Sequence, residues 1–136
     1  MGEIVIHSDG AARGNPGPSG AGAVLTDPEG KVVGEVCRYL GDDMTNNQAE
    51  YNALILALRE AEKTGATRLS IYADSELMVK QILGEYKVKN EGIKPLHSEV
   101  MLLLRRFGKY SISHIPREKN KRADKLANLA IDGQML

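Results

Sequence analysis

The chain has 136 residues, and its charge is balanced overall but divided: residues 1–79 hold 6 basic against 12 acidic side chains, and residues 80–136 hold 12 against 6. This length predicts one domain over residues 1–136 with a core of its own, and the single cysteine, Cys37, excludes an internal disulfide and a thiolate zinc site. The lack of a signal peptide and of any apolar run near about 20 residues predicts a cytoplasmic protein with no membrane contact, while the basic half could meet a polyanion.

The first half of the chain predicts three strands followed by a helix. Short β-branched runs, Gly/Pro-rich connections and the turn signal DPEG indicate an antiparallel meander. From Thr45 the apolar residues recur with a helical period that ends near Gly65. The expected elements are strands at 3–9, 20–26 and 31–39 and a helix at 45–65.

Strands and helices alternate in the second half. Residues 84–94 show no period and predict a connecting loop. The expected elements are strands at 68–73 and 110–115 and helices at 75–83, 95–108 and 120–131. This βββαβα-αβα order predicts an α/β fold in which helices pack on a five-stranded mixed sheet.

Four acidic residues stand near the ends of these elements: Asp9, Glu50, Asp74 and Asp124. Glu50 and Asp124 fall on the predicted buried stripes of their helices, where binary patterning favours apolar or small residues. Each acid could instead serve only its own element, as a turn residue (Asp9), a helix cap (Asp74, Asp124) or a partner of the helix dipole (Glu50). Because a mixed sheet can bring all four element ends to one edge, we favour a common site.

A site built from carboxylates alone favours a hard divalent cation, Mg²⁺ or Mn²⁺. Four carboxylates can hold two such ions about 4 Å apart, an arrangement that activates a water and stabilises the leaving oxygen in phosphoryl displacement. The chain has no Walker loop, no HExxH motif and no nucleophilic Ser or Cys constellation. The pattern therefore predicts hydrolysis of a phosphodiester.

The segments around the four acids resemble type 1 ribonuclease H. They are DGAARGNPGPSGAGAV, TNNQAEYNALILAL, ADSELMV and HIPREKNKRADKLAN, and they extend over nearly the whole chain. The family's four metal-binding acids fall on the four acids named above. The resemblance implies a ribonuclease H-like fold and an endonuclease that uses two metal ions to cut the RNA strand of RNA/DNA hybrids, leaving 3′-hydroxyl and 5′-phosphate ends.

The resemblance also implies further catalytic and substrate-contacting residues. His114, ten residues before Asp124, matches a histidine that assists proton transfer or product release; a plain strand-end histidine is the alternative. Glu50 and the backbone near Asp9 are expected to sense the ribose 2′-hydroxyl. The matched substrate contacts are Gly10, Asn15, Thr45, Asn46, Asn47 and Ser75, with Asn15 and Thr45 in a pocket for a DNA phosphate. A turn at Asn15 and a helix cap at Thr45 or Asn46 are the alternatives.

The chain departs from some family members in its substrate contacts. Asp43 lies near the position of a supporting arginine, Glu76 replaces a minor-groove glutamine, and residues 84–94 are too short for a basic, Trp-rich handle. Substrate affinity would then depend on Lys80, Lys87, Lys89, Lys94, Arg105 and Arg106. Some relatives without a handle act on RNA duplexes, so duplex RNA stays open as a second substrate, and no feature requires a dimer, so we expect a monomer.

Two other classes of protein remain as alternatives. A non-catalytic nucleic-acid-binding domain would keep the fold without turnover, although intact acids argue against it. A junction resolvase or integrase core would share the fold, but those proteins lack a GNPG loop combined with a TNNQAEY helix start.

Overall fold

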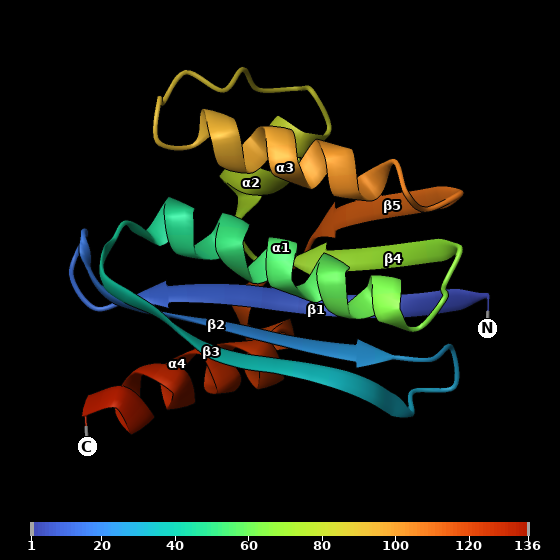
Figure 1. Ribbon diagram of the computed structural model, residues 1–136, viewed down its shortest axis with the longest axis horizontal. Coiled ribbons are helices and arrows are strands. Elements are labelled where there is room, and N and C mark those ends of the chain that lie inside the picture. Colours follow the sequence, from blue (N-terminus) through green and yellow to red (C-terminus); the bar gives the residue numbers. More distant parts are fainter. Residues whose placement is uncertain (1, 136) are drawn as a thin grey trace.

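The computed structural model describes residues 2–135 and is built around one mixed sheet of five strands (Figure 1). The strands lie in the order β3-β2-β1-β4-β5. β1, β2 and β3 form an antiparallel meander, and β4 and β5 run parallel to β1. Their bounds are β1 Glu3–Ala12, β2 Gly17–Thr26, β3 Val32–Met44, β4 Arg68–Ala73 and β5 Lys109–His114. The predicted fold class is confirmed.

Helices cover both faces of this sheet. α1 packs across β1, β2 and β3 on one face, α4 packs on the same three strands from the other face, and α3 packs against α1 (Figure 1). Their bounds are α1 Asn46–Lys63, α2 Glu76–Ile82, α3 Lys94–Leu104 and α4 Lys121–Met135, with a 3₁₀ turn at Arg117–Lys119 before α4. The sheet is therefore the middle layer, and side chains of its central strands can meet residues from either helical layer.

The main core lies between the sheet and α1. Apolar residues alternate in β4, where Leu69, Ile71 and Ala73 are buried as their spacing predicts. Tyr51, Leu54, Leu58 and other apolar residues of α1 are fully buried against this face. Burial of apolar surface contributes about 25 cal/mol per Å² to stability. It therefore holds α1 against the sheet in one position, which also positions Glu50.

On the opposite face, β2 has no side chains where α4 crosses it. A Cβ atom on Gly20 would lie 2.2 Å from the carbonyl oxygen of Ala127, and one on Gly22 would lie 2.1 Å from that of Ala123. Any larger residue would clash with the backbone of α4, so glycine is required for this close approach. α4 therefore rests directly on the backbone of β2.

Some predicted boundaries were wrong. β1 continues past Asp9 to Ala12 because β2 supplies pairing partners as far as Ser19, and Asp9 itself pairs with Gly22 inside the ladder. The interpretation of Asp9 as the first residue of a turn is therefore wrong. β3 likewise extends from the predicted 39 to Met44, and α4 extends from 131 to 135.

The helix predicted to reach Gly108 ends at Leu104. The amides of Arg106 and Phe107 donate to carbonyls three residues back, on Leu103 and Leu104, so tight turns replace the last helical turn. Phe107 is still buried, which explains why its apolar character extended the predicted helix.

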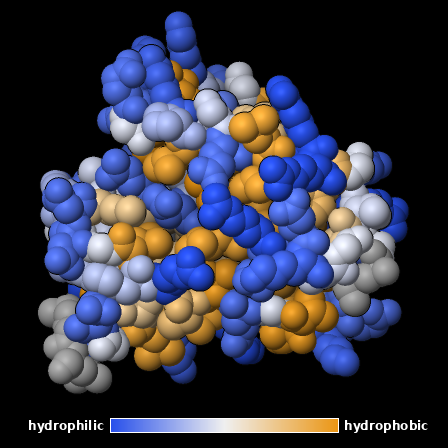
Figure 2. All heavy atoms as spheres, in the orientation of Figure 1, coloured by the Kyte–Doolittle hydropathy of each residue, from blue (hydrophilic) through white to orange (hydrophobic). Residues whose placement is uncertain are grey.

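The surface in the orientation of Figure 2 is mostly hydrophilic, with hydrophobic groups scattered between polar side chains. Within residues 2–135, none of the helices combines the length and the apolar character needed to cross a membrane.

Candidate active site

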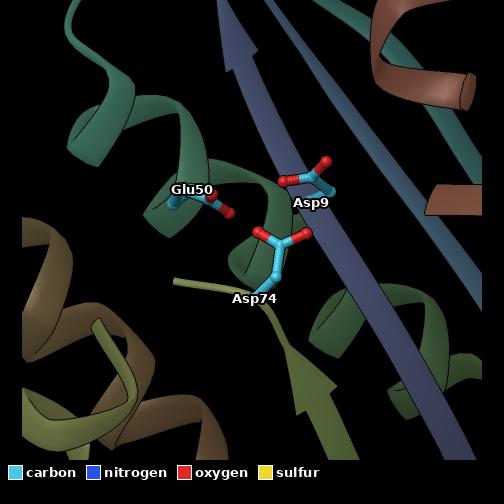
Figure 3. A group of neighbouring side chains, drawn as sticks. All are labelled: Asp9, Glu50 and Asp74. Carbon is cyan, nitrogen blue, oxygen red and sulfur yellow. The ribbon is translucent and has the colours of Figure 1, made fainter. Parts of the chain in front are cut away.

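Three of the predicted acids meet beside the carboxyl end of β4. Asp9 comes from β1, Glu50 from α1 and Asp74 from the residue after β4, and one carboxylate oxygen from each lies within 4.8 Å of the others (Figure 3). The three side chains converge from separate elements. Oxygen atoms so grouped form a chelating site for one hard cation.

The strand pairing explains why Asp9 and Asp74 meet. β1 and β4 are parallel neighbours with Ser8 opposite Ala73, so the next residue of each strand, an acid in both cases, emerges at the same edge. The carboxyl ends of parallel strands are the usual position of ligand sites in such sheets.

Glu50 joins them because β1 and α1 touch through their backbones. A Cβ on Gly10 would lie 2.2 Å from the carbonyl carbon of Ala49, so only glycine permits the contact. The Gly10 amide donates a hydrogen bond to Glu50 Oε1 at 3.0 Å. The first turns of α1 are thereby held against the strand that carries Asp9.

The acids are held in an environment that opposes their ionisation. Asp9 is 4% exposed, and burial, followed by the charges of Glu50 and Asp74, raises its pKa to about 10. Glu50 is 9% exposed, and burial followed by the Asp74 charge raises its pKa to about 8, although the Gly10 amide and the Arg117 charge act in the opposite direction. Such shifts arise where like charges share a desolvated space, and a divalent cation would relieve them.

Asp124 stands outside this group of three. It lies in the first turn of α4, its side chain is 31% exposed, and its Oδ1 is 3.5 Å from an Arg117 guanidinium nitrogen. It also accepts a hydrogen bond from Asn128 Nδ2 at 3.2 Å. It remains close enough to hydrogen-bond with Asp9, which contributes to the raised pKa of Asp9. The four predicted ligands therefore form a tight trio and a neighbour paired with an arginine.

Several predicted substrate contacts line the open cavity over the acids. The cavity has a volume of about 460 Å³, and Gly10, Asn46, Asn47 and Ser75 line it with the four acids. Ser75 also caps α2 by accepting a hydrogen bond from the Met78 amide at 3.2 Å.

Thr45, Asn15 and His114 do not line this cavity. Thr45 caps α1 through a reciprocal capping box with Gln48, as the cap interpretation predicts. Asn15 Oδ1 accepts from the Asn46 amide at 3.0 Å, which ties the loop after β1 to the start of α1. His114 is exposed at the end of β5 and pairs with Ala73, the residue before Asp74.

The structure adds three residues that sequence reasoning did not select: Arg117, Asn120 and Asn128. Asn128 is four residues after Asp124, so the two side chains share a helical face. Asn120 is four residues before Asp124, at the position where that face begins. Polar residues at this spacing around an acid on a buried stripe were the available signal.

Comparisons with known proteins agree on the family. A family described as reverse transcriptase-like matches residues 7–130. RNase H1 of the archaeon Halobacterium salinarum is 41% identical, with a TM-score of 0.94 over 97% of this chain and 99% of that one. LC11-RNase H1, isolated from compost, is 43% identical with a TM-score of 0.93 over all of both chains, and another of its crystal structures contains an RNA/DNA hybrid.

The full lengths of the curated relatives vary. This chain spans 36% of a bifunctional Mycobacterium tuberculosis protein and 65% of the Halobacterium ribonuclease HI, with 41% identity over 131 residues in both cases. Ribonuclease H of Lachnoclostridium phytofermentans is 31% identical, and the match covers 96% of this chain and 93% of that protein. The similarity therefore includes whole proteins of comparable size.

Proposed function

Since the chain belongs to the type 1 ribonuclease H family, we propose that it is an endonuclease that hydrolyses the RNA strand of RNA/DNA hybrids. The observation that carries this proposal is the trio of carboxylates within 4.8 Å at an open cavity of about 460 Å³. The cavity is open and its lining is polar, which suits the sugar-phosphate backbone of a polymer that must lie across the acids.

The residues present fit a divalent metal. All candidate ligands are carboxylates, two of them buried with raised pKa values, and Asp124 lies beside the trio as a fourth ligand for a second ion. Mg²⁺ or Mn²⁺, when bound, would lower the pKa of the attacking water and stabilise charge on the leaving O3′. Attack of that water on phosphorus with cleavage of the P–O3′ bond would leave 5′-phosphate and 3′-hydroxyl ends.

The protein's own groups would orient the RNA strand. The Gly10 amide already donates to Glu50 Oε1, so Glu50 is oriented before substrate binds, with its carboxylate lining the cavity where a 2′-hydroxyl or a cation would bind. Asn46, Asn47 and Ser75 surround the acids with hydrogen-bonding groups. All four acids come from one chain, which supports a functional monomer.

Substrate affinity would come from basic side chains that are not already paired with an acidic side chain of the protein. Lys80, Lys94 and Arg106 pair with Glu76, Glu91 and Glu62, respectively. Of the six cations named from the sequence, Lys87, Lys89 and Arg105 have no ion pair among the described residues, so we propose that these three are available to phosphates.

Incubation of the protein with labelled RNA/DNA hybrid, duplex RNA and duplex DNA, each in Mg²⁺ and in Mn²⁺, tests the substrate class. We expect cleavage of the RNA strand of the hybrid, with 5′-phosphate products and complete loss of activity in a chelator. Cutting of duplex RNA as well would extend the substrate range. Binding of the hybrid without turnover in either metal would instead indicate a non-catalytic binding domain.

Replacement of His114 by Ala is expected to lower kcat by about 100-fold, the lower range for a general acid or base, and to leave KM unchanged. His114 is exposed, so its loss should not alter stability. Steady-state kinetics on the hybrid, with the melting temperature measured alongside, provides the check. An unchanged kcat would assign His114 to the strand end alone.

A further inference from the structure

Asn120 is buried beneath the acidic site and contacts two of the elements that form it. It is 2% exposed, and its Nδ2 donates to the Ser8 carbonyl at 2.8 Å and to Asp74 Oδ2 at 3.1 Å. The orientation of this amide is determined by its partners, because a flipped amide would place Oδ1 against two acceptor oxygens. Both amide protons are therefore committed, one of them to a proposed metal ligand.

The position of Asn120 makes this arrangement unusual. Its backbone carbonyl accepts the first hydrogen bond of α4, from the Asp124 amide at 3.1 Å, so Asn120 is the residue that precedes the first turn. An Asn there normally uses its side-chain oxygen to cap the helix. Asn120 Oδ1 instead is buried without a hydrogen-bond partner among residues 2–135.

This arrangement costs stability at two points. The helix lacks the capping bond that this residue type could supply, and a buried acceptor stays unsatisfied. In return the amide joins β1 at Ser8, directly before Asp9, to the carboxylate of Asp74, while the same residue's carbonyl fixes the amide of Asp124. One residue thus links the backbone next to one acid and the carboxylate of a second through its side chain, and the helix start that carries a third through its carbonyl.

We propose that Asn120 is a positioning residue, whose carboxamide holds the Asp74 carboxylate in the orientation that binds metal. The inference rests on the proposed metal-dependent nuclease function. The hydrogen bond from the amide to Oδ2 of Asp74 restricts rotation of the carboxylate. Its remaining lone pairs then face the space between Asp74, Asp9 and Glu50, where a metal would bind. Partners that orient metal ligands typically contribute about 10- to 100-fold in metal affinity.

Titration calorimetry of Mn²⁺ into the substrate-free protein, well below the melting temperature, tests this role in Asn120→Ser. Serine keeps a side chain suited to a helix start but is too short to reach Asp74. We expect Mn²⁺ affinity to fall by about 10-fold or more. The matched control is Asn52→Ser, which removes an amide that donates to the Gln48 carbonyl at 2.8 Å, lies against Met44 and does not line the cavity over the acids. The control should bind Mn²⁺ as the wild type does.

A second measurement needs no variant. In ¹⁵N-labelled wild-type protein, the side-chain amide resonances of Asn120 should shift during a Mg²⁺ titration with the same half-saturation as cleavage of the hybrid, while those of Asn52 should not move. This keeps the inference testable if Asn120→Ser does not fold.

The outcomes separate the inference from the function beneath it. If Asn120→Ser bound Mn²⁺ as tightly as the wild type does, the positioning role would be overturned and the nuclease function would stand. The same would follow if the side-chain amide resonances of Asn120 did not shift with Mg²⁺. A wild-type protein that neither binds metal nor cuts hybrid would overturn both.

Discussion

Replacement of Asp9 by Asn is expected to lower kcat on an RNA/DNA hybrid by about 1000-fold or more, which corresponds to about 4 kcal/mol of transition-state stabilisation. Asp9 is the most buried of the three clustered acids, and its carboxylate shares the site with those of Glu50 and Asp74 (Figure 3). An amide of the same shape removes one charged ligand without creating a cavity. The loss should therefore appear in catalysis and metal affinity and not in folding.

The same substitution is expected to stabilise the metal-free protein at neutral pH. Burial and the neighbouring carboxylates raise the pKa of Asp9, and each unit of that shift corresponds to about 1.4 kcal/mol of unfavourable free energy in the ionised form. An uncharged Asn avoids this, so its melting temperature in a chelator should exceed that of the wild type. Function and stability oppose each other at this residue.

Single-turnover cleavage and thermal melts in a chelator measure both effects. Asp27→Asn is the matched control, because Asp27 is an exposed turn residue whose side-chain oxygen accepts from the Glu29 and Lys31 amides, bonds that an Asn can keep. Cleavage that survives in Asp9→Asn would contradict the proposed mechanism. A lower melting temperature than the wild type would contradict the electrostatic argument.

The second large effect is a loss of metal-free stability as the pH rises. The folded-state pKa values of Asp9 and Glu50 lie above the ordinary values of 3.8 and 4.5, so the native state binds more protons than the unfolded state above about pH 4. The free energy of unfolding must then fall with increasing pH, by up to about 1.4 kcal/mol per unit for each group. The loss extends to about pH 8 for Glu50 and about pH 10 for Asp9.

Thermal melts in a chelator between pH 5 and pH 8 should show this directly. A loss of several kcal/mol predicts a decrease in melting temperature on the order of 10 °C for a domain of this size. Saturating Mg²⁺ should raise the melting temperature more at pH 8 than at pH 5, because the metal binds the deprotonated acids. A double variant, Asp9→Asn with Glu50→Gln, should lose most of the pH dependence. A flat wild-type profile would show that the acids ionise freely in the fold.

The sequence predicted the fold because its local signals agree with one another. The alternation in β4, the capping box at Thr45 and the helical period of α1 each point to the element that forms. The errors were at boundaries set by tertiary partners: β1 extends past Asp9 only because β2 pairs with it, and no local signal in either strand specifies that pairing.

The acidic site was predictable in its members but not in its internal arrangement. Glu50 on a buried stripe and Asp74 at a strand end already indicated a common edge. That Asp124 would pair with Arg117, outside the trio, depends on side-chain conformations that no residue pattern specifies. The amide of Asn120 could not be predicted either, because an Asn before a helix reads first as a cap. The roles of the individual site residues stay predictions until the variants are measured.

The contact of α4 with Gly22 limits how the fourth acid can reach the others. Because the Ala123 carbonyl already lies against the backbone of β2, the helix has no space to move toward the sheet. The Ala123 carbonyl therefore limits how closely the backbone that carries Asp124 can approach the sheet, and the side-chain rotamer of Asp124 decides whether its carboxylate faces Arg117 or the trio. Gly22, which is also the ladder partner of Asp9, thus sets how closely the helix of the fourth acid lies to the strand of the first.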